Sequence, residues 1–535
     1  MLDRSRPDPV PRLGGITAYD PPRASCPTDL QLDVNEGRIP ASDLLSLLTG
    51  HGADCLRRYP DRRSLEAALA ARLEMPPSSV LVTAGADDAL DRICRAYLDS
   101  DRSLVVGVPT FEMIPRYARL TGARVLDVPW PGGDYPVAAV LARVADDTSV
   151  IAVVTPNNPT GAVAGADDLR RLSDSAPQTI LLVDLAYGEF ADEDLTPVVR
   201  ELPNAVGVRS FSKAWGLAGL RVGYAFGPER LIAPLRAAGG PYAVSGPSLL
   251  LAEKSLDDQQ AVRVFVDSTR RVRSILSEDL RSLNVEPLPS QANFVYARFA
   301  AARWVRDGLA GLGIAVRLFA AAEGEAGHLR ITCPAEGKTC DRLRQGLRTV
   351  LAPEAVLLDL DGVLADVRLS YHRCIVETAR SFGLDPSPNE VTAVSQKPGH
   401  NNDWVKTREL LARHGKFVDL ATITTRFQAI YADLANHETL IPGRELLVRL
   451  AARYPLAIVT GQPSREAEGF LQRFAIAHLF TTTICLEDGP EKPDPAGVRN
   501  ALDRLGVRAA WMVGDTVNDI IAARQAGVVP LGIVP

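Results

Sequence analysis

One lysine stands among residues that suit covalent chemistry beside a phosphate group. Lys213 lies in Arg-Ser-Phe-Ser-Lys-Ala-Trp-Gly-Leu-Ala-Gly-Leu-Arg, where Ser210 and Ser212 precede it and Arg221 follows it eight residues later. The two hydroxyls can donate hydrogen bonds to phosphate oxygens, and the guanidinium can add a forked, charge-assisted contact. Lys213 is then free to form a Schiff base with an aldehyde. An isolated Ser-x-Ser-Lys segment could equally be a solvated loop, so this interpretation depends on other segments.

Further polar side chains come directly after strand-like runs. Asp184 ends the apolar run that begins at Thr179, Tyr187 follows three residues later, and Asn158 lies in Thr-Pro-Asn-Asn-Pro-Thr-Gly. Open α/β sheets bind ligands at the carboxyl ends of their strands. A carboxylate there can keep a pyridine nitrogen protonated, while a phenol and an amide can bond the ring's 3′ oxygen. A plain turn asparagine is the alternative for Asn158.

Another segment begins a helix directly after a strand. Thr-Ala-Gly-Ala-Asp-Asp follows the strand-like Val80–Val82. The backbone amides of Ala86 and Asp87 can therefore hold a phosphate at the positive end of the helix dipole. Asp87 could also simply cap the helix, and the two roles are compatible.

The elements that must position these residues follow an alternating pattern. From residue 80 onward, short β-branched runs alternate with longer amphipathic segments, which predicts a mostly parallel sheet covered by helices on both faces. Near residue 245 a long helical stretch begins, followed by strand-like segments, and we expect a smaller α+β domain completed by the N-terminal segment. The predicted strands of the larger sheet are Val80–Thr83, Ser103–Val108, Val150–Thr155, Ile180–Asp184 and Ala205–Ser210.

Together these segments resemble the fold-type-I aminotransferases that depend on pyridoxal 5′-phosphate (PLP), and within them the histidinol-phosphate aminotransferase group. The resemblance covers about residues 15 to 350. It implies that Lys213 bonds PLP covalently, that Asp184 pairs with the pyridinium, and that Tyr187 and Asn158 bind the 3′ oxygen. Phe111, in Pro-Thr-Phe, would stack on the ring. The implied phosphate ligands are the amides of Ala86 and Asp87 together with Ser210, Ser212 and Arg221.

The same resemblance implies substrate and subunit contacts. Tyr59, in Arg-Tyr-Pro-Asp, corresponds to a tyrosine that reaches the cofactor phosphate of a neighbouring subunit, which implies a homodimer. Tyr19 would lie over the active site, Arg330 would bind the anionic group of the substrate, and Arg317 would assist it. A surface salt bridge is the alternative for each arginine. The family's usual Asn-Glu-Asn-Pro is replaced here by Asp-Val-Asn-Glu-Gly at residues 33–37, so the substrate stays open.

A second constellation of charged residues lies in the C-terminal third. Asp359 and Asp361 end a buried apolar strand, which is a costly arrangement unless a cation or a phosphate uses both carboxylates. Thr460 ends another strand-like run, and Lys492 lies in Glu-Lys-Pro-Asp. A lone Asp-x-Asp could be a strand-end turn, but four elements in this order argue against that. The fourth element is Gly-Asp-Thr-Val-Asn-Asp, which contains Asp515 and Asp519.

This set resembles the haloacid dehalogenase superfamily over residues 355 to 535. The resemblance implies that Asp359 attacks phosphorus, that Asp361 acts as general acid and then base, and that Thr460 and Lys492 hold phosphate oxygens. An aspartate two residues after the nucleophile favours a phosphatase over a dehalogenase, and a phosphomutase stays open. The implied Mg²⁺ ligands are drawn from Asp359, Asp361, Asp515 and Asp519.

The helix-breaking Ala352–Glu354 predicts the boundary between two domains. We expect an aminotransferase domain over residues 1–351, with a large part at about 50–245 and a small part at about 1–49 and 246–351. A phosphatase domain follows over 355–535, with strands at Val356–Leu360, Leu456–Thr460 and Ala510–Gly514. A helical subclass I cap is expected at about 367–440. Lys397 and Asn402 are its candidate substrate residues, although a plain polar loop is as good an interpretation.

The composition of the chain limits the partners and the cellular compartment that we expect for the protein. A chain of 535 residues with a net charge of −6 is too long for a single core and lacks the basic surface that nucleic acid requires. Its seven cysteines are never spaced Cys-x-x-Cys, which favours reduced thiols. No long apolar run or signal segment is apparent, so we expect a soluble cytoplasmic protein that binds neither nucleic acid nor membrane.

The sequence therefore predicts a bifunctional enzyme with PLP and Mg²⁺ as cofactors. It would transfer an amino group from a donor such as glutamate to a phosphorylated ketone or keto acid, and would hydrolyse the phosphomonoester. The alternative is a decarboxylase of a phospho-amino acid, similar to threonine-phosphate decarboxylases, coupled to the phosphatase. A PLP-sensing regulator would need a basic helix-turn-helix domain, and none is visible.

Overall fold

The computed structural model describes residues 10–533 apart from 15, 20–23, 25, 51–53, 321–324 and 396–401. By packing, the chain divides into two compact units, which are considered separately. The N-terminal unit comprises residues 1–23, 31–303 and 316–341, and the C-terminal unit comprises residues 24–30, 304–315 and 342–535. Among the described residues, no helix combines the length and the apolar character that crossing a bilayer requires.

The N-terminal unit contains a seven-stranded sheet in the order β2-β8-β7-β6-β5-β3-β4. Neighbouring strands are parallel except β8, which pairs antiparallel with both β2 and β7. The five predicted strands are all present, and only β5 differs in its bounds. The strands are β2 (Val80–Thr83), β3 (Ser103–Val108), β4 (Arg124–Pro129), β5 (Thr148–Val154), β6 (Ile180–Asp184), β7 (Ala205–Ser210) and β8 (Gly223–Phe226).

Both faces of this sheet are buried under helices. Along β3, Val105 packs into one core cluster, whereas Leu104 and Val106 pack into the other. Such alternation follows from the two-residue period of a strand, and near-continuous apolar runs are typical of parallel strands buried on both faces. The helices of this part are α3 (Arg63–Leu73), α4 (Gly85–Tyr97), α5 (Met113–Thr121), α6 (Val137–Leu141), α7 (Ala166–Ser175), α8 (Thr196–Glu201), α9 (Glu229–Ala238) and α10 (Gly246–Ser255).

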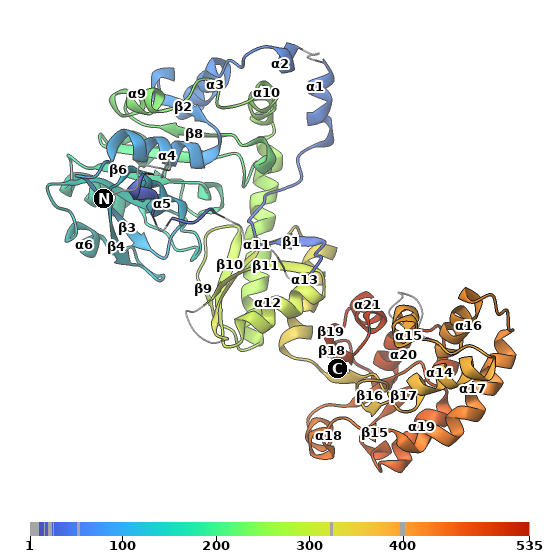
Figure 1. Cartoon of the computed structure of the whole chain (residues 1–535). Helices are drawn as coiled ribbons and strands as arrows, with labels where there is room; N and C mark the ends of the chain where they lie inside the picture. Colours follow the sequence, from blue (N-terminus) through green and yellow to red (C-terminus); the bar gives the residue numbers. More distant parts are fainter. Residues whose placement is uncertain are drawn as a thin grey trace, which may run out of the picture. The chain divides into compact units, whose positions relative to one another are not determined.

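A smaller five-stranded sheet has the order β1-β11-β12-β10-β9. The expected long helical stretch after residue 245 is divided into α10 and α11 (Gln259–Ser282), and Figure 1 shows α11 as a long green helix. The N-terminal segment supplies β1 to the small sheet, as the sequence predicts. The strands are β1 (Leu30–Leu32), β9 (Pro287–Leu288), β10 (Phe294–Phe299), β11 (Ile314–Ala320) and β12 (Gly327–Thr332).

The C-terminal unit is built on a parallel sheet in the order β17-β16-β13-β18-β19. Its strands are β13 (Ala355–Leu358), β16 (Leu456–Val459), β17 (Thr482–Ile484), β18 (Ala510–Gly514) and β19 (Val529–Gly532). The helices α18 (Arg444–Ala451), α19 (Ser464–Arg473), α20 (Ala496–Leu505) and α21 (Val517–Gln525) belong to the same unit.

A helical insert lies between β13 and β16 (orange in Figure 1). The short antiparallel pair β14 (Ala365–Asp366) and β15 (Thr439–Leu440) brackets it. Because these two strands pair, the insert leaves and re-enters the sheet domain at one place, as a cap must. Its helices are α14 (Tyr371–Ser381), α15 (Pro388–Ser395), α16 (Asp403–Arg413) and α17 (Leu420–Leu434).

Two helices that the sequence assigns to the first domain pack within the C-terminal unit. They are most of α12 (Ala302–Gly311) and α13 (Lys338–Leu351). The Trp511 indole of β18 lies edge-on to Trp304 of α12, with ring centroids 5.1 Å apart, and donates to the carbonyl of Thr349 at 2.9 Å. Trp511 thereby links both helices to the C-terminal sheet.

Two candidate active sites

A cavity of about 570 Å³ opens at the carboxyl ends of β5, β6 and β7 in the N-terminal unit. Nearly every residue predicted for cofactor or substrate binding in this unit lines it, and Tyr59 is the exception. The strands end where apolar runs give way to polar residues, which brings side chains from distant segments to one edge of the sheet. The predicted residues that line it are Tyr19, Ala86, Asp87, Phe111, Asn158, Asp184, Tyr187, Ser210, Ser212, Lys213, Arg221, Arg317 and Arg330.

Asp184 is a buried carboxylate at the end of β6. Burial raises its pKa to about 7, although the backbone amide of Ala186 donates to Oδ1 at 2.9 Å. Among the described residues it forms no salt bridge, so its charge is not paired by any side chain of that part of the chain. A protonated pyridine nitrogen would supply that partner, and in this respect the site fits PLP.

Lys213 lines the same cavity as Asp184. Its ammonium donates to the carbonyl oxygen of Val34 at 3.1 Å and lies 5.6 Å from the ring centroid of Tyr187. The hydroxyl of Tyr187 accepts a hydrogen bond from Asn35 Nδ2 at 2.9 Å. Asn35 therefore holds the phenol in place.

Asn35 is a site residue that the sequence prediction missed. It is buried, has a positive φ of 56°, and accepts a hydrogen bond from Thr332 Oγ1 at 3.0 Å. Asparagine tolerates this left-handed conformation better than most residues. The feature of the sequence that could have identified Asn35 was its position within the motif at residues 33–37.

The residues expected to bind the cofactor phosphate form a connected group. Arg221 donates to Asp87 Oδ2 at 2.8 Å and to Ser212 Oγ at 3.4 Å, and the amide of Ser212 donates to Ser210 Oγ at 3.0 Å. Gly85 begins α4 with a φ of +79°, and a Cβ there would lie 2.7 Å from Arg221 Nη2. Only glycine combines this conformation with so close an approach, which leaves the N-terminus of α4 open to an anion.

Arg330 is buried at the substrate end of the cavity. It donates to Asn158 Oδ1 at 2.5 Å and to the carbonyl of Asp33 at 2.6 Å, and burial lowers its pKa. Its Nε is buried and has no hydrogen-bond partner among the described residues. Arg317 lies directly across from Arg330 on β11, with Nη2 3.4 Å from Glu112 Oε1. The site therefore offers a buried donor to an anionic substrate group.

Tyr59 lies outside this cavity. Its side chain is 81% exposed and stacks on Tyr242 with ring centroids 4.5 Å apart. A role toward the cofactor of another subunit stays a prediction.

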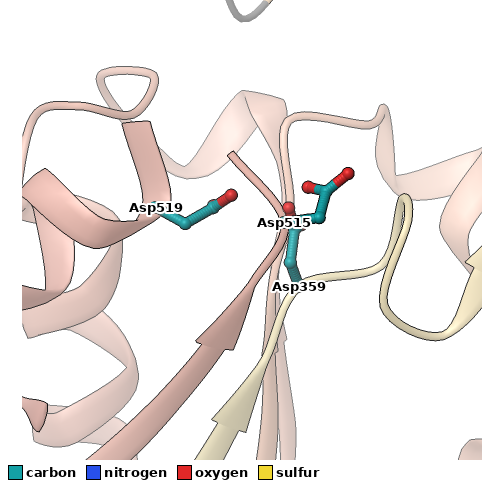
Figure 2. A group of neighbouring side chains, drawn as sticks. All are labelled: Asp359, Asp515 and Asp519. Carbon is teal, nitrogen blue, oxygen red and sulfur yellow. The ribbon is translucent and has the colours of Figure 1, made fainter. Parts of the chain in front are cut away.

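The second site lies at the carboxyl ends of β13 and β18. Figure 2 shows Asp359 and Asp515 beyond their strands and Asp519 extending from α21. One carboxylate oxygen from each lies within 4.8 Å of the other two. Lys492 Nζ lies 3.0 Å from Asp359 Oδ1 and also contacts Asp519. Burial and the charge of Asp519 raise the pKa of Asp359 well above its ordinary value.

These three carboxylates fit a divalent cation. Asp515 Oδ1 is buried without a hydrogen-bond partner among the described residues, and burial and Asp519 raise the pKa of this residue to about 6. Mg²⁺ prefers carboxylate oxygens and would relieve this repulsion. Gly362, at a φ of +68°, allows the close approach, because a Cβ there would lie 2.0 Å from Asp515 Oδ2.

Asp361 is not part of this triad, although the sequence included it among the metal ligands. Its Oδ1 instead accepts a hydrogen bond from Gln462 Nε2 at 2.5 Å. Burial and the charge of Asp403 raise its pKa to about 8, which favours the protonated form that a general acid requires. Gln462 was missed by the sequence prediction. Its position two residues after Thr460, whose Oγ1 accepts from the Gln462 amide at 3.1 Å, was the only signal.

A cavity of about 90 Å³ lies between these carboxylates and the cap. Asn402 lines it, caps α16 by accepting from the amides of Trp404 and Val405, and donates to Glu491 at 3.1 Å. The other cap residue predicted for substrate binding, Lys397, lies outside the described residues.

Models of two protein families match the chain in succession. Residues 52–347 match aminotransferase class I and II, and residues 353–527 match the haloacid dehalogenase-like hydrolases. The first match ends at residue 347 and the second begins at residue 353.

Curated relatives and solved structures agree with the first match. An aromatic amino acid aminotransferase of Mycobacteroides abscessus is 35% identical over 54% of this chain and 84% of the relative. A histidinol-phosphate aminotransferase of Granulibacter bethesdensis is 30% identical over 65% of this chain and 97% of the relative. The structure of histidinol-phosphate aminotransferase from Sinorhizobium meliloti in complex with PLP has a TM-score of 0.59 at 23% identity, covering 65% of this chain and 98% of that one.

Proposed function

The chain belongs to the class I and II aminotransferases and continues into a haloacid dehalogenase-like hydrolase, and we propose that the two enzymes act in sequence on one phosphorylated substrate. The first would transfer an amino group from a donor such as glutamate to a phosphorylated ketone or keto acid. The second would release inorganic phosphate from the resulting amine. The main support is that one chain carries both a buried, anion-binding arginine, Arg330, and a carboxylate set suited to phosphomonoester hydrolysis.

In the first site each residue has a defined task. PLP, when bound, supplies the electron sink that makes proton removal from the substrate carbon possible. Asp184 holds the positive charge on the ring nitrogen, and the pair of Asn35 and Tyr187 orients a phenol toward the ring oxygen. Lys213 Nζ takes the proton from the substrate carbon and returns it, while Arg330 fixes the anionic group.

In the second site Asp359 attacks phosphorus and Asp361 protonates the departing oxygen. Water then hydrolyses the aspartyl phosphate, with Asp361 as the base. Lys492 and Thr460 hold phosphate oxygens. Asp359, Asp515 and Asp519 would hold Mg²⁺, which offsets the charge of the phosphate.

The order of the two reactions follows from their energetics. Transamination is freely reversible, whereas phosphomonoester hydrolysis in water is strongly downhill. A phosphatase acting second therefore pulls the amination forward. Fusion in one chain keeps the two sites at high mutual concentration without requiring a tunnel.

A direct test supplies the protein with glutamate, PLP, Mg²⁺ and a panel of phosphorylated ketones, including imidazole-acetol phosphate. We expect 2-oxoglutarate, amine and free phosphate to appear together for one member of the panel. Release of CO₂ from a phospho-amino acid without formation of 2-oxoglutarate would instead support the decarboxylase. The relatives at 30% identity or more named above are aminotransferases, which favours amino transfer.

We expect Asp184→Asn to retain bound PLP and to lose roughly 10²–10³-fold in transamination rate, because the neutral amide no longer stabilises the charged ring. Absorbance of the bound cofactor and single-turnover kinetics measure the two effects. A near-normal rate with full occupancy would remove Asp184 from this role.

Removal of divalent cations should stop phosphate release and leave transamination unchanged, because among the described residues the carboxylate triad lies in the second site. Dialysis against a chelator followed by both assays tests this, and added Mg²⁺ should restore the phosphatase. Equal loss of both activities would contradict the assignment.

A homodimer is supported by apolar side chains exposed near the N-terminal end of the described chain. Ile39 is 93% exposed and Leu56 is 76% exposed, and Tyr59 and Tyr242 are exposed beside each other. Large apolar side chains that are exposed to this extent can mark an interaction surface. In a dimer, Tyr59 could then reach the cofactor phosphate of the partner.

We expect Leu56→Glu to halve the mass in sedimentation and to weaken PLP binding, because a buried charge at the interface costs more than the contacts return. Val264→Glu places the same charge on α11, where Val264 is 56% exposed, and should leave the mass unchanged. If Leu56→Glu stays dimeric, this surface is not the interface.

A further inference from the structure

The cavity under the cap presents hydrogen-bond acceptors at the end where the alcohol part of a substrate must lie. In the proposed mechanism Asp361 protonates the departing oxygen, whereas Thr460 and Lys492 hold the phosphate oxygens. Residues that line the cavity near Asp361 therefore contact the alcohol part. Two of them, Gln462 and Asp403, carry oxygen atoms that can accept hydrogen bonds.

Gln462 is fixed with its carbonyl oxygen unpaired. Its side-chain nitrogen donates to Asp361 at 2.5 Å, which determines the orientation of the amide. The residue is only 3% exposed, and its Oε1 is buried without a partner among the described residues. A buried acceptor of this kind is costly unless a ligand donates to it.

Asp403 begins α16 and lines the same cavity. Lys406 Nζ lies 2.6 Å from its Oδ1, and both side chains are 14% exposed. Within the described part of the chain, no side chain bonds Oδ2. A carboxylate can accept several hydrogen bonds, so Asp403 keeps an acceptor for a ligand while Lys406 holds it in position.

We propose that Asp403 and Gln462 form an ammonium-binding subsite, which makes the phosphatase selective for phosphomonoesters whose alcohol carries a protonated amine close to the ester oxygen. This rests on the proposed function, in which transamination produces that amine. An ammonium group donates up to three hydrogen bonds, whereas a ketone can only accept them. The keto phosphate would leave both acceptors unpaired, so the phosphatase would spare the substrate of the aminotransferase until it has been aminated.

The test uses the full-length protein with PLP and Mg²⁺ and compares two esters that differ in one group. These are 2-aminopropyl phosphate and isobutyl phosphate, in which a methyl group replaces the ammonium. We expect kcat/KM for the amine to exceed that for the isostere by at least about 10-fold, the size of one charge-assisted hydrogen bond. Because this comparison uses only the wild-type protein, its outcome does not depend on whether a variant folds.

Asp403→Asn should reduce the ratio of the two kcat/KM values by about 10-fold. Any effect on the protonation of Asp361 cancels in the ratio, because both esters use the same general acid. Glu409→Gln makes the same change of charge on α16, where Glu409 contacts Arg413 and does not line the cavity, and it should keep the ratio. Thermal melting of both variants verifies their folding.

A wild-type ratio of one or less overturns the subsite while leaving the phosphatase intact, and so does an unchanged ratio in folded Asp403→Asn. A ratio that falls equally in Glu409→Gln would also overturn it, because general electrostatics would then explain the preference. If the wild type hydrolyses neither ester nor p-nitrophenyl phosphate, the proposed phosphatase activity itself fails, and the subsite fails with it.

Discussion

Lys213→Ala is expected to abolish amine formation while phosphate release from a supplied amino phosphate continues. Loss of the group that moves the proton at the substrate carbon should reduce transamination by at least about 10³-fold, since positioned acid–base groups contribute roughly 10²–10⁴-fold. The covalent attachment of PLP should disappear as well. Borohydride reduction followed by peptide mapping measures attachment, and 2-oxoglutarate formation measures transamination.

The matched control is Lys254→Ala. Lys254 lies on α10, where it pairs with Asp257 at 2.8 Å and does not line the cofactor cavity. It should retain both the reduced adduct and the rate. An adduct that maps to a lysine other than Lys213 in the wild type would refute the assignment of the first site.

Asp359→Asn is expected to have the opposite effect, so that the phosphorylated amine accumulates in the complete reaction. Removal of the nucleophile from a covalent enzyme can cost about 10⁶-fold in kcat, and a loss of at least about 10³-fold is expected here. Asparagine keeps the shape of the side chain, so the buried pocket around Lys492 should stay packed. Mass spectrometry of the products and a free-phosphate assay distinguish accumulation from simple inactivity.

Asp385→Asn is the matched control for Asp359→Asn. Asp385 lies in the exposed part of the cap, where it pairs with Arg380 at 2.8 Å, and its replacement should leave phosphate release unchanged. If Asp359→Asn still releases phosphate at the wild-type rate, the nucleophile is another group. If it stops transamination as well, the two sites depend on each other in a way that a simple sequence of reactions does not explain.

Several features of the fold could be predicted because they depend on neighbouring residues. An apolar run that gives way to a polar residue marks the end of a buried strand, as at Asp184 and at Asp359, and the bounds of β2, β3, β6, β7 and β18 follow from this pattern. Parallel strands carry their carboxyl ends to one edge, so motifs that follow different strands converge. The order of the motifs along the chain was therefore enough to predict most of the residues that form each of the two candidate sites.

The packing of helices α12 and α13 could not be predicted in this way. Trp511 of the C-terminal sheet contacts Trp304 of α12 and donates to the carbonyl of Thr349 in α13, and by packing most of both helices belongs to the C-terminal unit. The aminotransferase match extends to residue 347, so the assignment of these helices to the first domain stays a prediction. Whether a tryptophan is exposed or buried depends on which other surface of the protein packs against it. The residues next to the tryptophan in the sequence do not specify that surface.

The sequence by itself indicated the chemistry that we propose, because residue types and their order along the chain identify side chains able to bond an aldehyde, attack phosphorus or hold a metal ion, and the strands that precede them. Only the tertiary structure decided how those side chains are oriented and how their pKa values are shifted. Asn35 meets Tyr187 across 152 residues, and Gln462 meets Asp361 across 101 residues. Hydrogen bonds between such distant residues depend on how whole elements pack, and burial in the packed site is also what moves the pKa of Asp184 and Asp361.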